Sequence, residues 1–213
     1  MRDLGDVEPE LRAALEVARG FGFLGPGDIS MGLDHAVACT RVLERYLGGS
    51  ADGRSVVDLG CGGGLPGLVA AALLPQSSWH FVDSNQRRMN VLAENVELLG
   101  LGRRCTIVCA RAEDFGRDPR MRHAFDAVVA RGFAAPAVTA ECAAPLLRPD
   151  GLLVVSDSPH GGDRWPEDGV SLLGLSGVAR IAMPFHFYVA RLSGVVAPQF
   201  PRRVGIPAKR PLF

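Results

Sequence analysis

The chain has 213 residues, equal numbers of acidic and basic side chains, and a hydrophobic fraction of 47%. This length and composition suffice for a packed core, so we expect one main domain with small extensions. No apolar stretch approaches the length of a membrane span, and the N-terminus lacks a signal-peptide core, which predicts a cytoplasmic protein with no membrane partner. A net charge of zero argues against attraction of nucleic acid by the molecule as a whole.

The cysteine pattern indicates neither a disulfide framework nor a metal site. The five cysteines are odd in number and form no C-x-x-C pair. Cys105 and Cys109 share the parity of Ile107 in an apolar run, as small buried side chains would. We therefore expect a cytoplasmic location and no bound metal.

The first fifty residues predict a helical extension, which we place at residues 1–50. Leu11, Ala14, Leu15 and Ala18 have helical spacing, and Pro9 suits the first turn of a helix. A glycine-rich hinge over residues 20–27 follows. A second helix is expected from about residue 31 to residue 47, before two glycines.

Strand and helix patterns then alternate, which predicts an α/β fold. A mostly parallel sheet with helices on both faces and right-handed crossovers accounts for this alternation. Two later strand-like segments, joined at Pro184, are expected to close the sheet as an antiparallel hairpin. We assign residues 51–197 to this domain and residues 198–213 to a basic tail. The expected strands are 55–59, 79–83, 105–109, 125–130, 151–156, 178–183 and 186–192, and the expected helices are 66–74, 85–99 and 136–147.

A glycine loop between the first strand and the following helix is the main functional signal. The apolar run at residues 56–59 contains one acid, Asp58, and is followed by Gly60, Gly62 and Gly64. A strand, a glycine turn and a helix N-terminus let the backbone approach a nucleotide-like ligand without Cβ collisions. Dinucleotide-binding enzymes use a similar loop, so the loop alone leaves both ligand classes open.

Asp83 ends the next strand, where its carboxylate can accept hydrogen bonds from ribose hydroxyls or cap the next helix. Such an acid suits NAD and S-adenosylmethionine equally. The form Asp58-x-Gly60-x-Gly62-x-Gly64 is more typical of methyltransferases than of dinucleotide-binding enzymes. The sequence therefore predicts a class I, Rossmann-like fold that binds S-adenosylmethionine.

Several segments together resemble the bacterial small-subunit (16S) rRNA guanine-N7 methyltransferases, also called the glucose-inhibited division B family, of which the chain looks like a divergent member. The resemblance spans about residues 23 to 213. Its elements are the loop over 58–67, Asp83-Ser84 with the arginines at 87–88, the segments 110–113 and 130–133, the tail over 200–212, and Leu33-Asp-His35.

The resemblance and the loop pattern together imply a set of site residues. The expected S-adenosylmethionine contacts are Gly60, Gly62, Gly64, Leu65, Asp83, Ser84, Ala112, Glu113 and Arg131. The expected RNA contacts are Phe133, His160, Arg202, Arg203 and Lys209. For several of these residues a purely structural role stays open. Arg131 could form an ion pair at the end of the sheet, Phe133 could be buried in the core, and Glu113 and His160 could be exposed. His35 could serve packing rather than catalysis, and the basic tail could simply hold itself to the domain.

The implied reaction is direct in-line methyl transfer to N7 of a guanine in small-subunit rRNA or a ribosomal subunit. N7 carries a free lone pair and no proton, so alignment of the reacting atoms can replace a general base. We therefore predict transfer without a general base and assign no catalytic residue. Residues 27–30 and 156–162 depart from the family pattern, and these departures keep open a small-molecule methyltransferase or a non-catalytic cofactor-binding relative.

Overall fold

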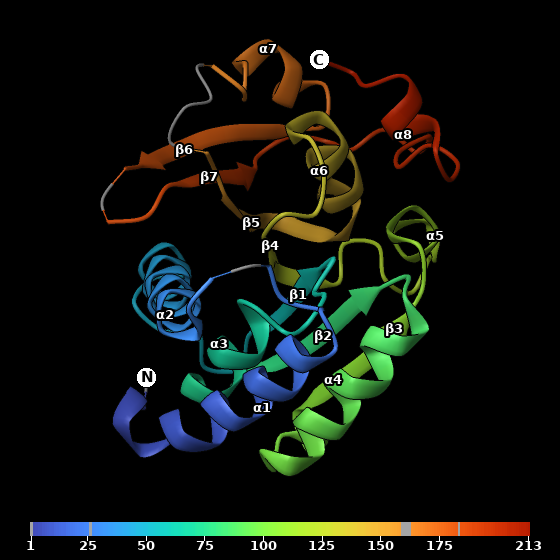
Figure 1. Cartoon of the computed structure of the whole chain (residues 1–213). Coiled ribbons are helices and arrows are strands. Elements are labelled where there is room, and N and C mark those ends of the chain that lie inside the picture. Colours follow the sequence, from blue (N-terminus) through green and yellow to red (C-terminus); the bar gives the residue numbers. More distant parts are fainter. Residues whose placement is uncertain (1, 26, 159–162, 183) are drawn as a thin grey trace.

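The structure, a computed structural model, describes residues 2–25, 27–158, 163–182 and 184–213. Its described strands form one seven-stranded sheet in the order β3-β2-β1-β4-β5-β7-β6 (Figure 1). Strands β1 to β5 run parallel, and β7 lies antiparallel to both β5 and β6. The strands are β1 (Ser55–Leu59), β2 (Ser78–Asp83), β3 (Cys105–Cys109), β4 (Phe125–Ala130), β5 (Leu147–Ser156), β6 (Leu175–Ile181) and β7 (Phe187–Leu192).

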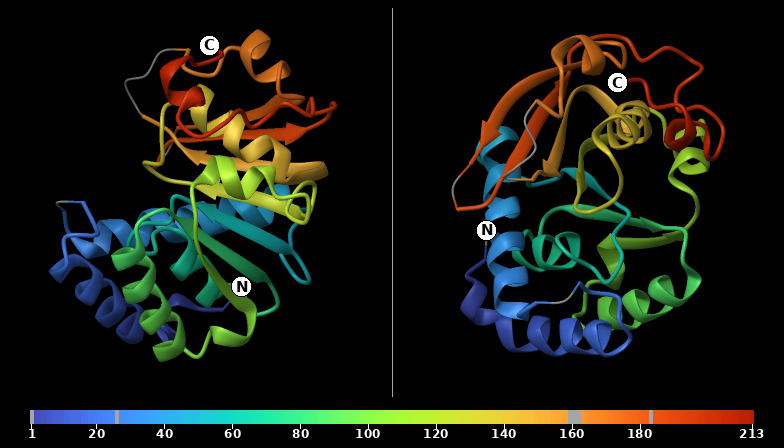
Figure 2. Two further views of the ribbon diagram at one scale, coloured as in Figure 1. Left: turned by 90° about the vertical axis from the view of Figure 1, so that its right-hand side faces the viewer. Right: turned by 45° about the horizontal axis from the view of Figure 1, so that its top comes forward.

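Helices cover both faces of this sheet. One layer holds α2, α3 and α4, with α1 lying against α4, and the other layer holds α5, α6 and α7; the C-terminal α8 contacts α6 (Figure 2). The α-helices are α1 (Glu8–Gly20), α2 (Ile29–Tyr46), α3 (Gly67–Leu73), α4 (Gln86–Leu98), α5 (Ala112–Arg117), α6 (Pro136–Ala143), α7 (Glu167–Ser171) and α8 (Ile206–Lys209). Short 3-10 turns are η1 (Leu4–Asp6), η2 (Gly102–Arg104) and η3 (Ala144–Leu146).

The burial pattern explains why the central strands lack hydrophobic alternation. Every residue of β4 is buried, because helices cover both sides of the sheet. Alternate positions of β4 supply different cores: Val129 packs with α2, α3 and α4, while Val128 packs with α5 and α6. The sheet therefore separates two apolar layers, and the loops that connect strands to helices lie at the ends of the strands.

The predicted α/β fold with a C-terminal antiparallel hairpin is confirmed. The predicted boundaries differ at several elements. The helix expected over 136–147 ends at Ala143 and continues as a 3-10 turn, and β5 already begins at Leu147. The sequence also missed α5, α7 and α8, because helices of four to six residues carry too few turns for an apolar period to show.

The N-terminal helices pack into the same core as the sheet. Leu11 and Leu15 of α1 and Leu33 of α2 are buried with Val56 of β1 in one apolar cluster. The division into residues 1–50, 51–197 and 198–213 stays a prediction. Within the described ranges, no helix has the length and apolar character needed to cross a bilayer. Three or more His, Cys, Asp or Glu side chains do not gather anywhere in these ranges as metal ligands would.

Two leucines of α4 give a matched test of this core. Leu92 is 1% exposed and packs against the glycine loop, whereas Leu98, less than two turns later, is 68% exposed. We expect Leu92→Ala to lower the free energy of unfolding by about 2–5 kcal/mol, because it leaves a cavity. Leu98→Ala should change it by less than about 0.5 kcal/mol. Urea unfolding followed by circular dichroism measures both, and equal losses would contradict the packing described.

Candidate functional site

The loop between β1 and α3 depends on glycine at several positions. Gly60, Gly62 and Gly64 have φ of 71°, 52° and 103°, in the left-handed region that side chains disfavour. A Cβ atom on Gly60 would also overlap the ring of Phe133. The backbone therefore passes directly beneath Phe133, at the carboxyl end of the parallel strands where α/β folds bind ligands.

A buried hydrogen bond fixes the end of this loop. The Gly67 N–H at the start of α3 donates to Asp58 Oδ2 at 2.8 Å. Burial raises the pKa of Asp58 to about 7, an effect that the Gly67 N–H and the Arg131 guanidinium oppose. A Cβ atom on Gly67 would collide with this carboxylate, so the tight strand–helix turn needs glycine here as well.

Asp83 at the end of β2 holds the glycine loop against the neighbouring strand. Its carboxylate accepts hydrogen bonds from the Gly62 N–H at 3.1 Å and the Asn85 N–H at 2.9 Å. Arg88 of α4 lies 3.6 Å from Asp83 Oδ2. Asn85, not Asp83, caps α4, since the Asn85 side chain accepts from the first helical N–H groups. The alternative role of Asp83 as a helix cap is therefore wrong.

Two cavities meet at the carboxyl edge of the sheet. The larger, about 450 Å³, and the smaller, about 260 Å³, share Gly60, Arg88 and Gly132 in their walls. Predicted cofactor residues divide between them. Gly60, Gly62, Leu65 and Arg131 line the larger cavity, and Gly60, Asp83, Ser84, Ala112 and Glu113 line the smaller one, together with the predicted RNA contact Phe133. Gly64 supports the loop from behind, against Leu68 and Leu92.

The sequence analysis missed one wall of the larger cavity. Phe23 and Leu24 line it from the segment between α1 and α2, and Met31 lines it from the first turn of α2 and remains 65% exposed. A Cβ atom on Gly63 would meet both Leu24 and the Phe23 carbonyl, so this segment packs on the glycine loop. The apolar pair Phe23-Leu24 within the glycine-rich hinge is the sequence feature that could have indicated this wall. Arg88, which was not among the predicted site residues, lines both cavities.

Four polar side chains at or near the larger cavity have a buried atom that makes no hydrogen bond. Within the described residues, these atoms are Arg131 Nη1, Arg88 Nε, Asp58 Oδ1 and His35 Nδ1. Arg131 also has no ion pair there, so the sheet-end salt bridge that was an alternative for it is not found. Arg131 thus has donor capacity for an anionic group in the cavity that it lines.

His35 has the packing environment expected of a structural residue. Its ring lies 5.1 Å from both Phe185 and Phe187, and Nε2 is 3.0 Å from Ser156 Oγ. Burial, together with Arg131, lowers the pKa of His35 to about 4, so the ring is neutral at physiological pH.

Glu113 joins the smaller cavity to the C-terminal tail. Glu113 is 3% exposed, so the alternative of an exposed acid is wrong, and its role as a cofactor contact stays a prediction. The carboxylate accepts from the Gly205 N–H at 2.9 Å and lies 3.5 Å from Arg111. Burial acts to raise the pKa of Glu113, but the Gly205 N–H, the Glu113 backbone N–H and Arg111 together outweigh it, and the net shift is downward. Ala208 of α8 consequently reaches the cavity wall.

The predicted RNA contacts of the tail separate into two groups. Arg202 is bound to the buried carboxylate of Glu141, with its Nε–H donating at 2.8 Å and Nη2 at 2.5 Å. This side chain therefore pins the tail to α6. Arg203 and Lys209 are exposed and have no ion pair within the described chain. His160 and most of the loop at 156–162 lie outside the described residues.

Comparison with known proteins identifies a family. The sequence model of a family described as rRNA small subunit methyltransferase G matches residues 30–165. A relative with that name from Synechococcus sp. (strain RCC307) is 39% identical, over 74% of this chain and 70% of its own length. Another from Pelotomaculum thermopropionicum is 33% identical, over 76% of this chain and 71% of its own length.

Solved structures share the fold at low sequence identity. A putative O-methyltransferase from Klebsiella pneumoniae has a TM-score of 0.60 at 16% identity, covering 88% of this chain and 90% of that protein. The cofactor-bound Rv0187 from MTB has a TM-score of 0.61 at 18% identity, covering 88% and 91%. These likenesses show a class I methyltransferase fold.

The buried histidine generates a prediction about acid stability. Because the folded pKa of His35 is about 4 and the ordinary value is 6.5, the unfolded chain takes up the proton first as the pH falls. Stability is therefore lost as the pH falls from about 6.5 toward 4, by about 2 kcal/mol between pH 7 and 5. In His35→Gln this loss should disappear.

Urea unfolding of both proteins at pH 7 and pH 5 measures the effect. Asp58 has the opposite pH dependence. Because its pKa is raised in the folded protein, its contribution to the free energy of unfolding is lost as the pH rises from about 4 toward 7. It acts in both proteins, so the difference between them isolates His35. Parallel losses in the two proteins would contradict the assignment.

Proposed function

The chain belongs to the rRNA small subunit methyltransferase G family, and we propose that it transfers a methyl group to N7 of a guanine in small-subunit rRNA. It is an S-adenosylmethionine-dependent methyltransferase. The observation that carries the proposal is the pair of cavities that meet at Gly60. The smaller cavity offers the Asp83 carboxylate and the glycine loop at Gly60 to an adenosyl group. The larger cavity offers Arg131 and an apolar wall.

The residues of the smaller cavity fit the adenosine half of S-adenosylmethionine. Asp83 retains acceptor capacity beyond its two backbone bonds, because an ionised carboxylate has about four lone-pair sites. The proposed role of Asp83 is to accept from ribose hydroxyls. Ser84, Ala112 and Glu113 would border the base, with the Glu113 carboxylate acting through its hold on the tail.

In the larger cavity, Gly60 and Gly62 expose backbone, and Arg131 offers an unused N–H to a carboxylate. Bound S-adenosylmethionine supplies a methyl group already activated on a sulfonium. The protein would hold the adenosine end of the cofactor in the smaller cavity and the methionine end in the larger one, so that the methyl group lies near Gly60 and Phe133.

The acceptor base is proposed to enter the larger cavity beside Phe23 and Met31, near the junction with the smaller cavity that Phe133 lines. Aromatic side chains hold RNA bases by stacking, and Phe23 lines the side of this cavity formed by the segment between α1 and α2. Guanine N7 has no proton to lose, so the residues need only align it with the methyl group; good alignment can lower a barrier by about 7–11 kcal/mol. His35 packs against two phenylalanines and lines neither cavity, and the proposed transfer requires no proton transfer by it.

Recognition of the rRNA backbone is proposed to involve the exposed cations of the tail, Arg203 and Lys209. Glu141 and Glu113 anchor this tail to the domain, and Ala208, next to Lys209, lines the smaller cavity, which supports this proposal. Such contacts add affinity without reading sequence. The substrate would be met in the cytoplasm, on free rRNA or on a ribosomal subunit.

A small-molecule methyltransferase is the rival. Gly27 and Asp28, which stand where the family has a different sequence, line the larger cavity. A changed wall could suit a different acceptor. The two hypotheses differ in whether rRNA receives the methyl group.

The deciding experiment uses S-adenosylmethionine with a tritiated methyl group and small ribosomal subunits from a strain that lacks the modification. We expect label in one guanosine of the rRNA, recovered as 7-methylguanosine after digestion to nucleosides. Subunits in which that guanosine is replaced by 7-deazaguanosine, which lacks N7, should stay unlabelled. Label that appears only in a small-molecule extract would favour the rival, and label at another atom would refute the N7 assignment.

The glycine turn provides a matched test of cofactor binding. Gly60→Ala adds both left-handed strain and an overlap with Phe133, whereas Gly100→Ala, at φ 66°, adds the same strain with no neighbour within 4 Å. Gly100→Ala should lose about 1–2 kcal/mol of stability from the backbone strain alone, and Gly60→Ala should lose more because of the added overlap. We expect Gly60→Ala also to weaken S-adenosylmethionine binding about tenfold or more, which is at least 1.4 kcal/mol.

Isothermal titration calorimetry with S-adenosylmethionine and its demethylated product measures this binding. Gly100→Ala should bind like the wild-type protein. Unchanged affinity in Gly60→Ala would remove the glycine turn from the cofactor site.

A further inference from the structure

Three arginines surround a cavity at the edge of the sheet opposite to the cofactor loops. This arginine pocket is lined by Arg54 before β1, Arg148 at the start of β5 and Arg191 at the end of β7, and has a volume of about 300 Å³. Tyr46 at the end of α2 and Asp126 near the start of β4 complete it. No local sequence pattern indicates this cluster, because its members are far apart along the chain.

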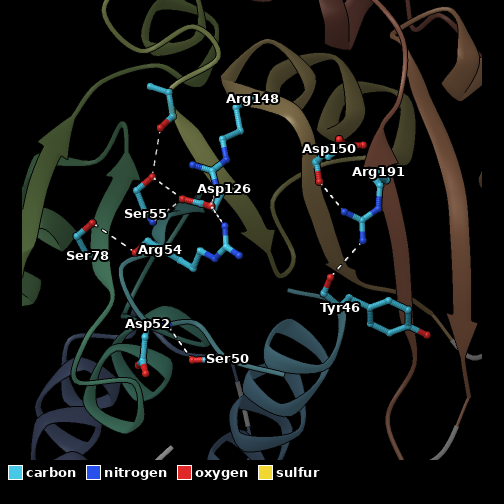
Figure 3. Close-up of polar contacts among 11 residues, drawn as sticks. Tyr46, Ser50, Asp52, Arg54, Ser55, Ser78, Asp126, Arg148, Asp150 and Arg191 are labelled. Atoms are coloured by element: carbon cyan, nitrogen blue, oxygen red, sulfur yellow. Dashed lines mark hydrogen bonds and ion pairs between the residues drawn. The ribbon is translucent and has the colours of Figure 1, made fainter. Parts of the chain in front are cut away.

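Asp126 fixes two of the three guanidinium groups. Its carboxylate is 3% exposed and accepts from Arg54 Nη1 and the Ser55 N–H, each at 2.9 Å. Arg148 Nη2 forms an ion pair with the same carboxylate. Figure 3 shows Arg54 and Arg148 converging on Asp126. One buried anion therefore holds two cations whose side chains remain about 40% exposed.

Arg191 is held by neutral groups instead. Its Nη1 donates to the Asp150 carbonyl at 2.7 Å and its Nη2 to the Tyr46 carbonyl at 3.2 Å (Figure 3). Among the described residues, no carboxylate lies within ion-pair distance of Arg191. A guanidinium has five N–H donors, so all three arginines keep donors that protein atoms do not use.

The charge of the pocket is positive. Three guanidinium groups and two carboxylates line the pocket. Asp126 already pairs with Arg54 and Arg148, and Asp150 lies at the exposed rim. Pre-positioned guanidinium groups with unused N–H donors suit the oxygens of a phosphate, which they bind in a bidentate manner. A phosphate group would add the anion that the cluster lacks.

We propose that the arginine pocket binds a backbone phosphate of the RNA substrate. Helix α2 begins at the wall of the larger cavity and ends at the arginine pocket, and its 18 residues span about 27 Å at 1.5 Å per residue. A small acceptor cannot reach both places, whereas a folded RNA can. The inference rests on the proposed rRNA substrate and adds a second contact, on the far edge of the sheet, to the base in the cavity.

The test compares Arg191→Gln and Arg148→Gln with Arg103→Gln, a control in which an exposed arginine outside the pocket loses the same charge. Both pocket variants leave Arg54 on Asp126, and thermal melting checks that they are folded. Binding of rRNA is measured as a function of salt concentration. We expect each pocket variant to bind rRNA several-fold more weakly and its log–log salt slope to fall by about one.

The control should keep the wild-type slope, and all variants should keep the wild-type affinity for S-adenosylmethionine. Methyl transfer in the pocket variants should show a raised KM for the ribosomal subunit with kcat unchanged. Wild-type salt slopes in both pocket variants would overturn the proposal. Failure of the proposed function has a different signature, since the wild-type protein would then leave rRNA unlabelled whatever the slopes.

Inorganic pyrophosphate distinguishes an RNA phosphate from a free one. We expect it to bind the wild-type protein in calorimetry, to lose affinity with Arg191→Gln, and to compete with rRNA. Pyrophosphate that binds in the pocket without competing with rRNA would assign the pocket to a free phosphate compound and overturn the RNA contact.

Discussion

The hydrogen bond from the Gly67 N–H to the buried carboxylate of Asp58 fixes the turn on which the site depends. It sets where α3 begins, and so it sets the path of the loop from Gly60 to Gly64. The cost of burying this acid is visible in its pKa, which burial raises to about 7. On one side of the loop the Gly62 N–H donates to the Asp83 carboxylate, and on the other side the segment around Phe23 packs against Gly63.

Buried carboxylates recur as the devices that attach outlying segments to the core. Glu113 holds the backbone of Gly205, and Glu141 holds both the backbone and the guanidinium of Arg202. A buried acid is costly unless it is paired and hydrogen-bonded, so each of these contacts specifies one position for the tail. The tail thereby becomes part of the wall of the smaller cavity through Ala208. Asp126 does the same at the opposite edge, for two arginines.

The arrangement gives the two edges of the sheet different roles. The carboxyl edge carries the cavities that meet at Gly60, and the amino edge carries the arginine pocket. Helix α2 runs between them and packs on the sheet through residues such as Leu33. A substrate that touches both edges must be large, which ties the proposed RNA phosphate contact to the choice of a macromolecular acceptor over a small one.

The sequence by itself determined the α/β fold, the glycine loop and Asp83 beside it, because these depend on short-range patterns: apolar runs, left-handed glycines and one acid at a strand end. Tertiary structure alone decided the partners of Glu113, the pinning of Arg202 by Glu141 and the clustering of arginines around Asp126. Those contacts join residues that are distant along the chain, from 22 positions for Arg148 and Asp126 to 92 for Gly205 and Glu113. Local propensity carries no information about such pairs, since the packing of separate elements brings them together.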